Sequence, residues 1–135
     1  MAVAVFRNAA LIGLVCAACT SIAVDARTFE GTRWRVTAIN GRATPANGDY
    51  RLQFERGKIS GRFGCNGFGG RYSVRRDQLI AREIASTLMG CPEPAMSFEA
   101  AGLRVLAGPA RLSWTSSARL MLSNRAGSIA LKRVR

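Results

Sequence analysis

Of the four cysteines, Cys65 and Cys91 are the residues whose chemistry the sequence indicates most directly. Cys65 lies in the glycine-rich stretch 61–73, and Cys91 follows 26 residues later in STLMGCPEP. Two cysteines in an oxidising compartment usually pair, and closing such a loop stabilises a fold by roughly 3–4 kcal/mol in the chain-entropy model. We therefore expect a structural disulfide. Two unpaired buried thiols, or redox or metal chemistry, remain the alternatives.

The chain offers few other groups for catalysis or metal binding. It contains no histidine, so the usual base of a catalytic triad is absent and zinc lacks its common ligands. Its eight acidic residues are scattered, and its serines follow no nucleophile-elbow pattern. We expect a protein that is not an enzyme and that holds no metal or cofactor.

The charge balance is strongly basic, with a formal net charge of +12. Such a charge attracts nucleic acid, anionic lipid or lipopolysaccharide. The arginines are nevertheless dispersed, whereas a nucleic-acid-binding tail is normally a block, so we expect no nucleic-acid partner. The best candidate for an anion-binding face is the group Arg62, Arg71, Arg75 and Arg76. Ordinary solvation of a charged surface is the alternative reading of this group.

Residues 1–26 have the order of a secretory signal peptide. Arg7 precedes an apolar run over 9–18, and small residues mark cleavage sites after Ala23 or Ala26. The run is short for a transmembrane helix, which needs about 20 apolar residues. Cys19 is a candidate lipidation site, but Cys16 occupies the position where a larger aliphatic residue is expected. We expect a periplasmic or secreted protein, with a membrane-anchored lipoprotein as the alternative.

The elements that must position these residues are mostly short strands. Apolar and polar residues alternate at period two, and turn residues separate the segments. A helical period begins near Met96, after two prolines, and Gly108-Pro109 ends it. The strand segments are 32–39, 50–55, 59–64, 70–74, 78–82, 83–86, 111–115, 119–123 and 128–133, where 78–82 and 83–86 are two strands or one bent strand. This pattern predicts one α+β domain over 27–135. The domain is β-rich, with about eight mostly antiparallel strands in a curved sheet or partial barrel and one helix packed against it.

Several separated motifs resemble the META domain, as found in the heat-shock protein HslJ family. They are GCN-x-F-x-G-x-Y, T-x-M-x-C and a glutamate early in the helix, and the resemblance covers about residues 31–133. The matching residues are Gly64, Cys65, Asn66, Phe68, Gly70, Tyr72, Thr87, Met89, Cys91 and Glu99. The resemblance implies a β-rich fold with one helix and a bacterial envelope location. It also implies links to stress tolerance, drug resistance, secretion or virulence, without a catalytic reaction.

Three of these residues form a candidate polar cluster. Asn66 favours turns, and we expect its side chain to hydrogen-bond backbone groups of its own turn, with Thr87 and Glu99 joining in a structural network. A hydrogen bond from Asn66 to a ligand, or a catalytic role for the cluster, is the alternative. The function that we expect is non-enzymatic binding of a protein or lipid partner in the envelope stress response, by a monomer. The alternative is a periplasmic binder of an anionic envelope component through the arginine-rich surface.

Overall fold

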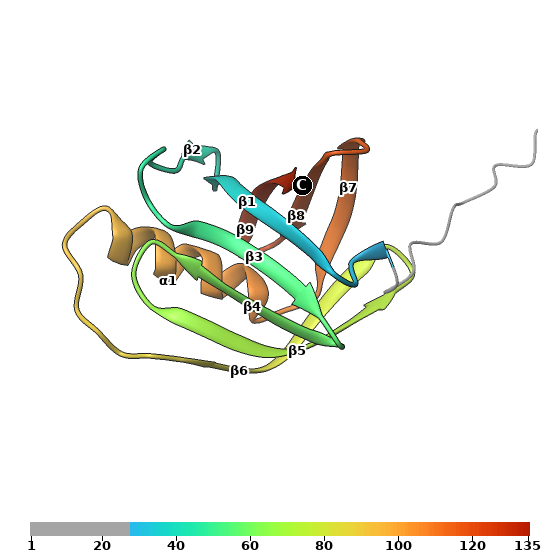
Figure 1. The fold of residues 1–135 in the computed structure, drawn as a ribbon, viewed down its shortest axis with the longest axis horizontal. Coiled ribbons are helices and arrows are strands. Elements are labelled where there is room, and N and C mark those ends of the chain that lie inside the picture. Colours follow the sequence, from blue (N-terminus) through green and yellow to red (C-terminus); the bar gives the residue numbers. More distant parts are fainter. Residues whose placement is uncertain (1–27) are drawn as a thin grey trace, which may run out of the picture.

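The computed structural model describes residues 28–135, so the expected signal peptide and Cys19 lie outside the described residues. This part of the chain contains nine strands and one α-helix (Figure 1). The strands before the helix are β1 (Thr32–Ile39), β2 (Arg42–Ala43), β3 (Tyr50–Glu55), β4 (Lys58–Phe63), β5 (Gly67–Arg75) and β6 (Gln78–Ser86). The helix α1 (Ala95–Leu106) is followed by β7 (Ala110–Ser116), β8 (Arg119–Asn124) and β9 (Gly127–Val134).

The strands form a closed antiparallel barrel. Sequence neighbours pair in order from β3 to β9, and β1 pairs with both β3 and β9. This second pairing closes a barrel of eight strands, with the two-residue β2 as an extra strand on β1. Closure leaves most backbone groups paired, which solves the edge problem of a small β-rich chain. The predicted β-rich α+β class is confirmed, and the predicted curvature proceeds to a complete ring.

The ring has one weak seam, between β6 and β7. Only Gln78 with Arg111 and Leu79 with Ala110 are paired there, whereas every other pair of neighbouring barrel strands shares at least four residue pairs. The helix α1 lies against the barrel and packs on β9, β4, β1 and β8 (Figure 1). No helix among residues 28–135 is long and apolar enough to cross a membrane.

The core lies inside the barrel and beneath the helix. Period-two alternation turns one face of each strand inward, and α1 contributes Phe98, Val105 and Leu106. Each such large apolar side chain, once buried, stabilises the fold by roughly 1.5–3 kcal/mol. The largest fully buried strand side chains are Trp34, Val36, Ile39, Leu52, Phe54, Ile59, Phe63, Leu79, Leu122 and Ile129.

The structure decides between the two readings of 78–86 in favour of one bent strand. It is β6, with a bulge where Glu83 adopts a φ of 54° and the register with β5 shifts. Gly70 lies opposite this bulge, and a Cβ there would stand 2.6 Å from the carbonyl oxygen of Arg82. The strand β2 is not among the predicted segments, because two exposed residues give no periodic signal.

Candidate functional site

The loop 87–94, which joins β6 to α1, is fixed to the rest of the fold by a disulfide. Cys65 and Cys91 are bonded, with their Cα atoms 5.9 Å apart. Cys65 is buried in the turn between β4 and β5, and Cys91 lies four residues before the first residue of α1. The bond therefore ties the glycine-rich turn to the entrance of the helix. It closes a loop that the chain-entropy model values at roughly 3–4 kcal/mol.

Asn66 makes a second attachment beside the disulfide. Its Oδ1 accepts hydrogen bonds from the Met89 backbone N–H at 2.7 Å and the Thr87 hydroxyl at 2.9 Å. Its Nδ2 donates to the Met89 carbonyl oxygen at 3.1 Å and to Glu99 Oε2 at 3.0 Å. All four hydrogen-bonding positions of the amide are thus used. The expectation that Asn66 serves its own turn is wrong, because these backbone partners lie 23 residues later; the predicted grouping with Thr87 and Glu99 is present.

Glu99 is the least satisfied member of this network. The side chain lies in the second turn of α1, and the residue is only 6% exposed. Its Oε2 accepts from Asn66, but its Oε1 is buried and has no hydrogen-bond partner among the described residues. An unpaired buried acceptor costs roughly 1–3 kcal/mol, more when it is charged. Such a group is a candidate binding determinant, because a ligand that donates to it removes this cost.

A depression of about 430 Å³ lies over this network. Its wall includes Asn66, Glu99, Ser86 at the end of β6 and the loop residues 87–90, together with Leu103 of α1. Three exposed apolar side chains border it: Leu88 is 95% exposed, Met89 52% and Met96 36%. Only one other large apolar side chain in the described part of the chain, Val134, is similarly exposed. Single exposed apolar residues are ordinary, but a cluster around a depression marks an interaction surface.

The remaining motif residues serve the fold. Gly64 has a φ of 94°, and a Cβ there would lie 2.5 Å from the Tyr50 hydroxyl, so only glycine fits. Phe68 faces the core and packs on Phe63. Tyr72 lies farther along β5, where its hydroxyl donates to Glu30 Oε1 at 2.6 Å.

Glu30 fastens the turn between β3 and β4. It accepts from Tyr72 and also from the backbone N–H groups of Arg56 at 2.7 Å and Gly57 at 2.9 Å. The hydrogen bond from Tyr72, followed by that from Gly57, holds the Glu30 pKa below its usual value, although burial opposes this. Burial, and next the bond to Glu30, raises the pKa of Tyr72. Tyr72 therefore has a structural role: through Glu30 it helps to hold the β3–β4 turn, and it does not take part in the hydrogen bonds that Asn66 makes with the loop 87–94.

The four arginines of the expected anion-binding face do not gather. Arg62 donates to the Cys65 carbonyl oxygen at 3.0 Å and pairs with Asp49 at 3.4 Å, which assigns it a structural role. Arg71 forms an exposed ion pair with Glu83. Arg71 and Arg75 lie four residues apart on β5, a distance of about 13 Å along a strand, and Arg76 is in the turn beyond.

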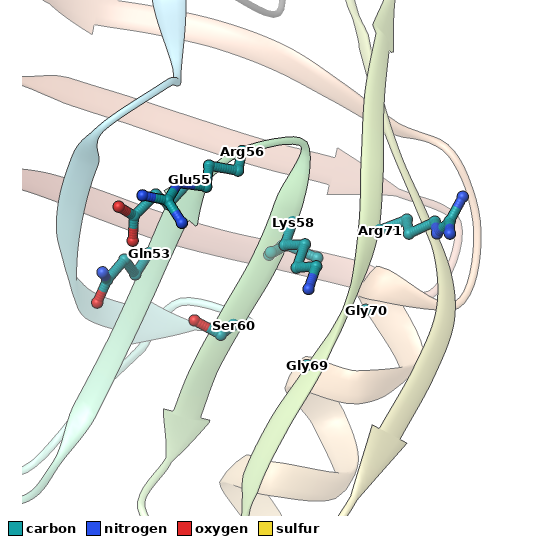
Figure 2. Close-up of a pocket in the computed structure, with 9 residues that line it drawn as sticks. Gln53, Glu55, Arg56, Lys58, Ser60, Gly69, Gly70 and Arg71 are labelled. Carbon is teal, nitrogen blue, oxygen red and sulfur yellow. The ribbon is translucent and has the colours of Figure 1, made fainter.

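A different set of cations lines the outer face of β3, β4 and β5. A depression on this face has a volume of about 650 Å³. Figure 2 shows its polar lining residues, the cations Arg56, Lys58 and Arg71 together with Gln53, Glu55 and Ser60. Of the four predicted arginines, only Arg71 belongs to it. Its other two cations come from the β3–β4 turn and the start of β4, which the sequence analysis did not single out.

Sequence reasoning also missed the apolar border of the first depression. A signal was available in the charge pattern, because residues 83–103 form the longest stretch without lysine or arginine in the described chain. This stretch contains three of the eight acidic residues. It includes Leu88, Met96 and Glu99, so the loop and the first half of α1 make a weakly acidic, apolar surface on a basic protein.

The chemistry available here is hydrogen bonding and apolar contact. Within residues 28–135, no group of three or more histidine, cysteine or acidic side chains is arranged to hold a metal ion. Cys65 of the β4–β5 turn and Cys91 of the loop 87–94 are joined in the disulfide. The arrangement is suited to binding.

Comparison with known proteins supports the same grouping of motifs. The sequence model of the META domain family matches residues 27–134. The chain belongs to the META domain family. Two solved structures share the fold of this META domain. One NMR structure is 22% identical, with a TM-score of 0.71, and covers 81% of this chain and 94% of that chain. The second, an NMR structure from Burkholderia xenovorans, is 21% identical, with a TM-score of 0.67, and covers 81% and 86%. No curated protein matches the sequence.

Proposed function

We propose that this META domain is a non-enzymatic binding protein of the bacterial envelope, which holds a protein partner against the loop 87–94 and α1 during envelope stress. The observation that carries the proposal is the gathering of Leu88, Met89 and Met96 around one depression. A second support is that the loop is immobilised by the disulfide and by Asn66. A surface fixed before binding loses little conformational entropy on binding.

We propose a location in the bacterial envelope from the disulfide and from the signal-peptide pattern of the sequence. A disulfide in a small domain is compatible with an oxidising compartment, such as a periplasm, and the first 26 residues have the order of a signal peptide. Lipidation at Cys19 is the alternative route to the envelope. We expect the protein to act as a monomer, which light scattering of the purified protein would measure.

Crosslinking pull-down from stressed cells tests the binding proposal. Leu88→Ser and Met96→Ser should each abolish recovery of a stoichiometric partner. Val134→Ser is the matched control, because Val134 is 49% exposed but lies at the end of β9. Equal recovery with all three variants, or recovery that is lost with the control alone, would refute the assignment of this surface. Recovery of lipid in place of protein would replace the protein partner by a lipid.

A second candidate function is binding of an anionic envelope component. The depression in Figure 2, with Arg56, Lys58 and Arg71 on its border, favours it. Retention on liposomes containing anionic lipid, or on lipopolysaccharide, should then fall steeply with salt and fall again in Lys58→Gln. Arg125→Gln, a change in the β8–β9 turn, is the control for net charge. Equal losses in both variants would leave only a general charge effect.

A further inference from the structure

The depression over Glu99 continues along the helix. A neighbouring depression of about 500 Å³ is lined by β6 residues 81–84 on one side and by Leu106 and Ala107 of α1 on the other. Both depressions include Ser86 and Leu103, so together they form one groove between β6 and α1. We call this the β6–α1 groove. Its length follows the strand, which makes it suitable for an elongated occupant.

One wall of the β6–α1 groove is a strand edge. Beyond Leu79, β6 pairs with β5 on one side and with no described strand on the other. The edge of a sheet presents backbone N–H and C=O groups that can pair with an added strand. The bulge at Glu83 bends β6. The part of the unpaired β6 edge that lies between this bulge and the loop 87–94 is Ile84–Ser86. An occupant with an extended backbone fits this wall.

The other wall is apolar and carries the unpaired carboxylate oxygen. Leu103 and Met96 of α1 line it, and the buried Glu99 lies between them in the helix. Residues 83–103 contain no lysine or arginine, so the end of the groove around Glu99 is acidic although the whole protein carries +12. The arginine that lines the groove, Arg82, belongs to the neighbouring depression. Charge complementarity therefore favours a basic side chain at this position, against the attraction of the molecule as a whole for anions.

We propose that the β6–α1 groove binds an extended peptide segment of a partner protein that carries alternating apolar side chains and a lysine or arginine. The backbone of the segment pairs with the β6 edge, its apolar side chains cover Leu103 and Met96, and its basic side chain donates to Glu99 Oε1. This inference rests on the proposed function, because it uses the same surface. It adds the backbone conformation and the charge of the partner.

Three synthetic peptides of about eight residues, the length of an ordinary strand, test the inference. They alternate valine with lysine, with glutamate or with glutamine, and binding to the intact oxidised protein is measured by fluorescence anisotropy. The net charge of the protein alone predicts that the glutamate peptide binds best. The inference predicts that the lysine peptide binds about tenfold more tightly than the glutamine peptide and more tightly than the glutamate peptide. The order that net charge predicts would overturn it.

Variants locate the effect. Glu99→Gln keeps an oxygen for Asn66 and should lose the preference for the lysine peptide over the glutamine peptide. Met96→Lys changes a side chain that is 36% exposed, so it tests the same charge preference even if the Glu99 variant fails to fold. Methylating alternate backbone nitrogens of the lysine peptide should abolish binding if the β6 edge is used. Unchanged binding in any of these three experiments contradicts the corresponding contact.

The two proposals fail in distinguishable ways. Loss of peptide binding and of partner recovery in Leu88→Ser, with an unchanged lysine preference in Glu99→Gln, would overturn only the inference about charge. Full peptide binding and full recovery in Leu88→Ser would remove the proposed surface itself.

Discussion

Replacing Asn66 with aspartate should make the stability of the domain depend on pH in a way that the native protein does not. The change keeps the two acceptor positions that hold Thr87 and the Met89 N–H, but it removes the amide donors. It also places a carboxylate where Nδ2 now lies 3.0 Å from Glu99 Oε2. Two carboxylates this close cannot both be ionised without a large energetic cost.

The loss of stability in Asn66→Asp is set by the smaller of two energies: the repulsion between the two carboxylates, or the cost of keeping one of them protonated. Two unit charges 3.0 Å apart repel by about 5 kcal/mol at an effective dielectric constant of about 20. The pair avoids this by binding one proton. Keeping a proton at pH 7 on a group with an ordinary pKa near 4 costs about 4 kcal/mol, and only about 1 kcal/mol at pH 4.5. The lost hydrogen bond to Met89 adds about 1 kcal/mol at either pH.

We therefore expect Asn66→Asp to lower the free energy of unfolding by about 5 kcal/mol at pH 7 and by about 2 kcal/mol at pH 4.5. The penalty grows as pH rises through the unfolded pKa, because the shared proton raises the pKa of the folded pair. Denaturant unfolding at the two pH values measures it. Combining Asn66→Asp with Glu99→Gln removes the second carboxylate, so the difference in penalty between the two pH values should shrink. The same penalty for the aspartate variant at both pH values would refute the proximity of the two groups.

Three further changes test the frame around the site. Cys91→Ser should lower the free energy of unfolding by roughly 3–4 kcal/mol under oxidising conditions and by little under reducing conditions, and the native protein should gain two hydrogens in intact mass on reduction. Gly70→Ala should lower the denaturation midpoint by an amount equivalent to about 1–3 kcal/mol, because its Cβ would lie 2.6 Å from a β6 carbonyl oxygen. Gly69→Ala, whose Cβ would come no closer than 3.7 Å to any neighbour, should change it by less than about 1 kcal/mol, and equal effects would contradict the register. Because the folded pKa of Glu30 is depressed, its stabilisation is present above the unfolded pKa and is lost as pH falls through the folded value. Glu30→Gln should therefore flatten acid unfolding below about pH 4.5, and an unchanged acid limb would contradict the hydrogen bond from Tyr72.

The sequence predicted the strands and the helix because their signals are local. Alternation in 50–55 and 59–64 follows from one wet and one dry face, and the turn at Asn40-Gly41 has the positive φ values expected of that pair. Closure of the barrel by β1 and β9 could not be predicted in this way. It depends on the sum of twist and register over eight strands, which no single segment determines.

The candidate site was likewise predictable only in part. The grouping of Asn66, Thr87 and Glu99 could be anticipated from the motifs, but the backbone partners of Asn66 could not. A turn-forming residue has the same sequence signal whether it caps its own turn or a loop 23 residues later. Leu88 gave no signal as a surface residue, because exposure depends on what packs nearby and not on residue type.

The weak seam between β6 and β7 has a consequence for how the domain opens. Separating these two strands breaks only two residue pairs and converts the ring into an open eight-stranded sheet with its other ladders intact. The first cooperative unit to unzip should therefore lie along this line. Amide hydrogens at the start of β7 should exchange before those of β8, and the covalent link to Cys65 keeps the beginning of α1 from swinging away when this happens.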